Sequence, residues 1–259
     1  MNILDEIIAA KRIEVEETKK RQDLDEIVKN LSARKERSFK QALIESRSGI
    51  IAEFKRKSPS KGWIFENAKV EEVVPEYAQS GASAISVLTN EQFFGGTYND
   101  LRKARTLVDI PLLNKDFIID EYQLYQARLA GADVILLIAA ALTNKECYSL
   151  AAKAKGLGLE VLLEIHSPEE LDYINEYVDV AGINNRNLTT FKTEIQLSFS
   201  LADRIPANIV KIAESGIMLP EVVKDLRSVG FSGFLIGERF MKTKEPGKAL
   251  EEFINDLHV

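Results

Sequence analysis

The sequence contains a single cysteine, Cys147, so an internal disulfide is excluded. We interpret Cys147 as a small apolar side chain within a helix rather than as a nucleophile. No apolar stretch reaches the length of a membrane span, and charged residues interrupt the first apolar segment, unlike the core of a signal peptide. We therefore expect a cytoplasmic protein that does not contact a membrane.

A concentrated basic surface is also missing. The 34 lysine and arginine residues are outnumbered by 40 acidic residues, which gives a net charge of −6 and a pI near 5.3. Nucleic-acid backbones require concentrated positive charge, so we expect no nucleic-acid partner. Hydrophobic residues make up 45% of the chain and charged residues 29%, which is typical of a globular protein with a sizeable core. A small molecule is the expected ligand.

The first part of the chain has the pattern of an amphipathic helix. Ile3, Leu4, Ile7 and Ile8 recur at helical spacing, with charged residues between them. We predict that residues 1–47 form a helical extension packed on the main body.

Short apolar runs fill the rest of the chain, each followed by a polar stretch and an amphipathic helical pattern. They are nearly continuous in apolar character, as strands covered on both faces are. Gly81, Gly131 and Gly230 mark helix ends just before strands. The eight runs span residues 50–54, 84–88, 111–115, 134–138, 159–164, 180–184, 209–214 and 233–237.

This alternation predicts an α/β fold, a (β/α)8 TIM barrel that forms one domain over residues 1–259. A doubly wound parallel sheet is the alternative. After the fifth run, Ser167 and Pro168 predict the N-cap and first turn of a helix.

Polar residues end several of the predicted strands. In a barrel these ends converge on one face, where active sites form. Burying charged groups there costs several kcal/mol unless they are paired, so the set indicates function rather than stability. Lysines and glutamates at close range suit acid and base catalysis, because burial and a neighbouring ammonium lower the pKa of a lysine, whereas burial raises the pKa of a glutamate. The residues are Glu53, Lys55, Lys115, Glu164, Asn184 and Glu214, and they carry no metal-site signature.

Two glycine turns follow the last two strands, in Glu214-Ser215-Gly216 and Gly237-Glu238. In this fold the loops after strands seven and eight commonly bind phosphate through backbone N–H groups, and glycine lets the anion approach. We therefore predict a phosphate site here.

Residues 53–62 combine a strand end with several basic residues and a Ser-Pro turn. We interpret them as a lid over a phosphorylated substrate, and the alternative is an exposed basic loop. Trp63 is expected to pack locally, and His166, which precedes a predicted helix, to be a surface or capping residue. Phe94 and Phe117 lie in loops after strands, where aromatic rings either pack or stack on a flat ligand.

The ordered motifs resemble the indole-3-glycerol phosphate synthase family, and the resemblance covers nearly the whole chain. It lies in Ile51-Ala52-Glu53-Phe54-Lys55-Arg56-Lys57-Ser58-Pro59-Ser60, Phe94-Gly95-Gly96, Leu113-Asn114-Lys115-Asp116-Phe117, Leu162-Leu163-Glu164, Ile183-Asn184-Asn185-Arg186 and Ala213-Glu214-Ser215-Gly216. It implies ring closure of 1-(2-carboxyphenylamino)-1-deoxyribulose 5-phosphate to indole-3-glycerol phosphate, with loss of carbon dioxide and water. It also implies that no cofactor is used.

The resemblance implies roles for individual residues. Lys115 would be the general acid, Lys55 would bind the substrate carboxylate, and Glu53 and Glu164 would be bases, with Asn184 beside them. The implied substrate-binding residues are Ser58, Phe94, Phe117, Leu136, Arg186, Glu214, Ser215, Gly216, Gly237 and Glu238. The first helix departs from the family, since it lacks the aromatic residue that some members place over the substrate ring. We expect a monomer.

Two other functions fit a phosphate-binding barrel. A phosphoribosyl anthranilate isomerase would need a cysteine–aspartate pair at strand ends, whereas Cys147 lies in a predicted helix. A catalytically inactive barrel that binds a metabolite is the second alternative, and Lys55, Lys115 and Glu164 argue against it.

Overall fold

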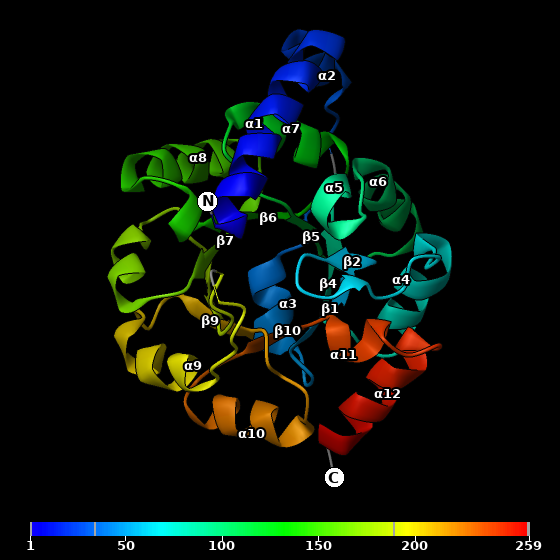
Figure 1. Ribbon diagram of the computed structural model, residues 1–259, viewed down its shortest axis with the longest axis vertical. Coiled ribbons are helices and arrows are strands. Elements are labelled where there is room, and N and C mark those ends of the chain that lie inside the picture. Colours follow the sequence, from blue (N-terminus) through cyan, green and yellow to red (C-terminus); the bar gives the residue numbers. More distant parts are fainter. Residues whose placement is uncertain (1, 34, 189, 258–259) are drawn as a thin grey trace.

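The computed structural model describes residues 2–33, 35–188 and 190–257. Parallel strands form a closed barrel in the order β1-β10-β9-β8-β7-β6-β5-β4, and β1 pairs with both β10 and β4 (Figure 1). The expected TIM barrel is thus confirmed, and the doubly wound alternative is excluded because the sheet has no free edge. The strands are β1 (Ile50–Phe54), β4 (Ala84–Leu88), β5 (Leu112–Lys115), β6 (Val134–Ile138), β7 (Glu160–Ile165), β8 (Val180–Asn184), β9 (Val210–Glu214) and β10 (Gly233–Ile236).

Helices encircle the strands in Figure 1, and two short strands form a separate hairpin. The hairpin comprises β2 (Lys57–Ser58) and β3 (Gly62–Trp63). The helices after the first barrel strand are α4 (Val70–Gln79), α5 (Glu91–Phe94), α6 (Tyr98–Leu107), α7 (Glu121–Leu129), η1 (Ala139–Ala141), α8 (Asn144–Gly156), η2 (Pro168–Tyr173), α9 (Gln196–Leu201), η3 (Ala202–Arg204), α10 (Pro220–Ser228), α11 (Glu238–Met241) and α12 (Pro246–Leu257).

Strand alternation divides the core into two layers. In β1, Ile50, Ala52 and Phe54 face the helices, whereas Ile51 faces the barrel interior. Both layers are apolar and buried, which explains why the strand sequences are nearly continuous in hydrophobic residues. Glu53 shares the inward side with Ile51, and it is therefore carried into the barrel mouth.

Three helices precede the barrel: α1 (Ile3–Arg21), α2 (Leu24–Asn30) and α3 (Phe39–Glu45). Phe39 and Leu43 of α3 are buried against the inward-facing strand residues, so α3 closes the end of the barrel opposite the active-site mouth. Helices α1 and α2 pack against α7. The buried ammonium of Lys11 in α1 also lies 2.9 Å from Oδ1 of Asp116, which ties this helix to the end of β5.

Local predictions have mixed outcomes. Gly81, Gly131 and Gly230 adopt left-handed φ angles of 95°, 93° and 89° after their helices, as predicted. The helix predicted to begin at Ser167 is only the 3-10 helix η2, and the Ser167 side chain makes no capping hydrogen bond there. Cys147 is buried in α8, and burial raises its pKa to about 11. None of the described helices combines the length and the hydropathy of a transmembrane segment.

Candidate active site

A pocket of about 560 Å³ opens at the carboxyl ends of the barrel strands. Every residue that the sequence predicted for the site lines this one pocket. They are Lys115, Glu164, Lys55, Glu53, Asn184, Ser58, Phe94, Phe117, Leu136, Arg186, Glu214, Ser215, Gly216, Gly237 and Glu238. Parallel strands of a closed barrel all end at the same face, so side chains that are distant in sequence meet there.

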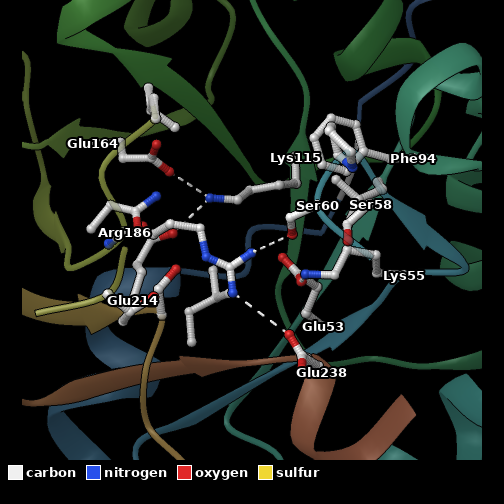
Figure 2. Close-up of a pocket in the computed structure, with 18 of the residues that line it drawn as sticks. Glu53, Lys55, Ser58, Ser60, Phe94, Lys115, Glu164, Arg186, Glu214 and Glu238 are labelled. Atoms are coloured by element: carbon white, nitrogen blue, oxygen red, sulfur yellow. Dashed lines mark hydrogen bonds and ion pairs between the residues drawn. The ribbon is translucent and has the colours of Figure 1, made fainter. Parts of the chain in front are cut away.

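Lys115 lines the pocket and forms ion pairs with two glutamates. Its Nζ donates to Oε2 of Glu164 and to Oε2 of Glu214, both at 2.6 Å. Figure 2 shows the lysine reaching toward the two carboxylates, which come from β7 and β9. The three side chains are almost completely shielded from solvent, so each charge depends on the others for compensation.

The three groups of this cluster have altered acidity. Burial lowers the pKa of Lys115, but the charges of Glu164, Glu214 and Glu53 raise it by more. Burial raises the pKa of Glu164, yet Lys115 and His166 bring it well below its usual value. Burial and the neighbouring Glu164 raise the pKa of Glu214 to about 7, against the lowering effect of Lys115.

These directions correct a sequence-based expectation. We expected burial and a neighbouring ammonium to lower the pKa of a catalytic lysine and burial to raise that of a glutamate. The first expectation is wrong for Lys115, since three carboxylates face it. The second is wrong for Glu164 and holds for Glu214.

A second ion pair lies on the β1 side of the pocket. Lys55 donates to Oε1 of Glu53, its neighbour two residues earlier. The backbone of Gly237 comes so close to this carboxylate that any Cβ at that position would clash with it, so glycine is required there. In residues 2–33, 35–188 and 190–257, no three histidine, cysteine or acidic side chains are grouped as metal ligands.

Two successive residues of the turn after β9 have left-handed backbone conformations. Ser215 and Gly216 have φ angles of 64° and 78°. Backbone turns can group successive N–H groups into a concavity that receives an anion. A side chain is rarely tolerated in this region of φ, and Ser215 adopts it at the pocket wall.

Arg186 bridges the two sides of the pocket mouth. Its Nη1 lies 3.2 Å from Oγ of Ser60, and its Nη2 lies 3.6 Å from Oε2 of Glu238, as Figure 2 shows. It therefore connects the hairpin of β2 and β3 to the start of α11. Within that hairpin the Oγ of Ser58 is buried and has no hydrogen-bond partner among the described residues, although it borders the pocket.

The basic run that leads into the hairpin is only partly exposed. The Arg56 guanidinium makes two hydrogen bonds to Asp100, of 2.8 and 2.9 Å, and its side chain is mostly buried. The alternative of an exposed basic loop is therefore wrong for Arg56, which fastens the hairpin to α6. Trp63 packs against Gly95 and Lys57, but half of its surface remains exposed.

Comparison with known proteins identifies the family. A family model described as "Indole-3-glycerol phosphate synthase" matches residues 4–253. The chain belongs to the indole-3-glycerol phosphate synthase family. The family resemblance seen in the motifs is confirmed, and so is the expected activity, that of a carboxy-lyase in tryptophan biosynthesis.

Two relatives with this name match along at least 90% of their length. The indole-3-glycerol phosphate synthase of Bacteroides thetaiotaomicron is 58% identical over 257 residues, which cover 99% of both chains. That of Prochlorococcus marinus is 42% identical and covers 99% of this chain and 90% of its own. Among solved structures, 3-hexulose-6-phosphate synthase from Salmonella typhimurium aligns over 81% of this chain and 98% of its own, with a TM-score of 0.62 and 13% identity. That similarity shows the barrel fold alone.

Two phenylalanines and two residues of the first helix line the pocket together. The rings of Phe94 and Phe117 lie 6.0 Å apart between centroids and are tilted by 31°. Ile3 and Ile7 of α1 line the same pocket. Aliphatic side chains from the first helix therefore complete the pocket wall in this chain, a contribution that the amphipathic pattern alone did not reveal.

His166 is another residue whose surroundings the sequence analysis did not predict. We expected a surface or capping side chain, which is wrong: only 10% of the side chain is exposed, and its Nε2 lies 3.2 Å from Oε1 of Glu164. A signal was present, because residues two apart on an extended chain point to the same side, and His166 directly follows the end of β7. The Ser-Pro sequence that follows drew the interpretation toward a helix start instead.

Proposed function

We propose that this pocket closes the indole ring of 1-(2-carboxyphenylamino)-1-deoxyribulose 5-phosphate, with Lys115 as the general acid. The observation that carries this proposal is the position of the Lys115 ammonium, 2.6 Å from each of two buried carboxylates at the floor of the pocket. Aromatic side chains on one side and glycine turns on the other match the anthranilate ring and the phosphate of this substrate.

In the first step, the anthranilate ring carbon attacks the carbonyl of the ribulose chain. The Lys115 ammonium donates its proton to the carbonyl oxygen as negative charge develops there. The raised pKa of Lys115 keeps the proton on the amine before reaction. Transfer remains favourable because an alkoxide is a stronger base than an amine.

The later steps remove carbon dioxide and water. Lys55 holds the substrate carboxylate until it leaves as carbon dioxide, and then supplies the proton with which the hydroxyl leaves as water. One ring C–H proton is lost when the hydroxyl leaves, and Glu164, with Glu53 beside it, accepts that proton. Both carboxylates stabilise the cationic intermediates by their charge. Asn184 orients the substrate hydroxyls between them.

Substrate binding divides between two sides of the pocket. Phe94 and Phe117, with Leu136 below them, hold the anthranilate ring. The phosphate accepts hydrogen bonds from backbone N–H groups at the two glycine turns and from the free hydroxyl of Ser58, while Arg186 holds the hairpin closed. The groups on this side are Ser215, Gly216, Gly237, Glu238 and Ser58.

The proposal includes the setting in which the enzyme works. We propose a cytoplasmic protein that binds its phosphorylated substrate, and the net charge of −6 argues against a nucleic-acid partner. We also propose that the whole chain is one domain and works as a monomer, since one chain supplies every pocket residue named above. Light scattering of the purified protein tests this directly, and a stable dimer would contradict it.

A fluorescence assay for indole formation tests the function. The purified protein is mixed with the carboxyphenylamino deoxyribulose phosphate, and the indole product is followed by its emission. We expect multiple turnovers without added metal or cofactor. Absence of product from protein that is folded by circular dichroism would contradict the proposal.

A further inference from the structure

His166 lies beside Glu164, and none of the proposed steps uses it. Its Nε2 is 3.2 Å from Oε1 of Glu164, and its Nδ1 is 3.6 Å from Oε2 of Glu170. The same Glu170 oxygen accepts a hydrogen bond of 2.7 Å from the backbone N–H of His166. The imidazole is therefore held between two carboxylates, one of which belongs to the catalytic cluster.

The two carboxylates that share Lys115 differ in their second oxygen. In Glu164 that oxygen faces His166, so each of its oxygens is next to a nitrogen donor. In Glu214 the second oxygen is buried and has no hydrogen-bond partner among the described residues. A charged oxygen without a partner is costly to bury, whereas one beside a cation is stabilised. The surroundings therefore favour negative charge on Glu164 over Glu214.

The ring itself is charged at neutral pH. Burial lowers the pKa of His166, but Glu164 and Glu170 raise it by more, to about 9. Among the described residues, these two carboxylates act most strongly on the ring. Of the elements next to the end of β7, β6 ends in isoleucine, β8 ends in asparagine and η1 consists of alanines, whereas η2 carries Glu169 and Asp172 besides Glu170. Neither ring nitrogen has a well-directed hydrogen bond among the described residues, so the contact acts through charge.

We propose that His166 is a positioning residue for the reaction: its imidazolium holds the Glu164 carboxylate against Lys115 and keeps it ionised. Glu214, which lacks such a partner, is then the member of the cluster that takes up a proton near neutral pH. The inference rests on the proposed role of Glu164 as a base. It assigns a role to His166, which does not itself react. Because His166 contacts Glu164 and not Glu214, the two glutamates have different protonation states.

His166→Gln tests the inference, because glutamine keeps polarity and approximate size but cannot carry the charge. Turnover at saturating substrate is measured from pH 5 to pH 10. The ratio of wild-type to variant kcat should be near one above pH 9, where the wild-type imidazole is also neutral. It should rise to roughly tenfold at pH 5, as Glu164 becomes easier to protonate. A ratio that stays constant across this range, whether one or larger, would overturn the inference.

Glu170→Gln is the matched control, because it removes the other partner of the ring and leaves Glu164 in place. The imidazole then loses part of its stabilisation, so the ratio should rise in the same direction but less than in His166→Gln. A larger effect in Glu170→Gln than in His166→Gln would contradict the proposal, since the carboxylate of Glu170 would then act without the histidine.

The pKa of His166 can also be measured by NMR, which tests the inference without an activity measurement on a variant. The chain has two histidines, so His258→Gln assigns the ring proton signals of the wild-type protein by NMR. The His166 signal should titrate near pH 9 and move down by at least one unit in Glu164→Gln. A signal that titrates near pH 6.5, or one that Glu164→Gln leaves unchanged, overturns the inference. Failure of the ring-closure assay alone would contradict the proposed function and leave this titration intact.

Discussion

The two ends of the barrel interior are built from the same strands but bury opposite kinds of side chain. At the end closed by α3, Phe39 and Leu43 pack on inward-facing aliphatic residues such as Ile51. At the other end the next inward positions are charged, with Glu53 following Ile51 and Glu164 following Leu162. Apolar burial at the closed end stabilises the fold. Burial of charged groups at the open end costs free energy, which this apolar burial offsets.

This comparison predicts that substitutions at the open end reduce turnover and those at the closed end reduce stability. The largest effect is expected at Lys115. Lys115→Ala removes the proton donor for the carbonyl oxygen, so kcat should fall roughly 10²–10⁴-fold. The indole assay measures this, and circular dichroism checks that the barrel persists. Turnover near that of the wild type would remove Lys115 from the mechanism.

Glu164→Gln should follow closely. The amide keeps the shape of the side chain but can neither accept a proton nor carry charge beside Lys115, so we expect a loss of about 10²-fold or more in kcat. The pH dependence of the remaining activity is the decisive measurement. If it matched that of the wild type, Glu164 would not be the base.

The closed end should respond in the opposite way. Leu43→Ala leaves a cavity beneath the barrel and should lower the free energy of unfolding by about 2–5 kcal/mol, with kcat unchanged at a temperature where the protein is folded. Ile44→Ala is the control on the same helix. Ile44 is 52% exposed, and its loss should change stability by about 0.5 kcal/mol or less. Equal losses from both would show that α3 does not close the core.

Stability should fall as pH rises through the titrations of the open end. A folded pKa of about 9 for His166 lies above the usual 6.5, so its contribution is complete below pH 6.5 and is lost as pH rises through 9. The corresponding loss from Glu214 runs from pH 4.5 to 7 and precedes it. Between pH 7 and 10, urea unfolding should show a loss on the order of 2 to 3 kcal/mol. His166→Gln should remove most of that slope.

Arg186 is expected to give the smallest effect. Arg186→Gln breaks the links to Ser60 and Glu238 but leaves the acid and base groups in place. KM for the sugar phosphate should rise roughly tenfold, a cost of about 1.4 kcal/mol, with a smaller change in kcat. A fall in kcat without a change in KM would assign Arg186 to the chemistry rather than to closure over the substrate.

The strand ends could be read from sequence because a parallel barrel imposes one simple rule on them. Once the runs ending in Glu53, Lys115, Glu164 and Glu214 are recognised as strands, their last inward residues must share one mouth. The composition of the hairpin after β1 suggests a lid, but nothing in the sequence indicates the bidentate anchoring of Arg56 by Asp100. That contact joins residues 44 positions apart, which no local pattern encodes.

The sequence also did not show that α1 contributes to the pocket, because this contact too joins residues that are far apart in the chain. Its amphipathic pattern predicts a helix with one buried face, yet the pattern does not say which surface that face covers. Ile3 and Ile7 reach the pocket because Lys11 pairs with Asp116, 105 positions away and next to Lys115.

By itself, the sequence determined the barrel, the family and the set of groups that meet in the pocket, because periodic burial and strand ends are local properties of the chain. Only the tertiary structure decided how those groups share charge. Lys115 and Glu214 are 99 positions apart, and their pKa values depend on distances of a few ångströms and on burial. It also decided that His166 faces Glu164, which separates two glutamates that the sequence presents as equivalent.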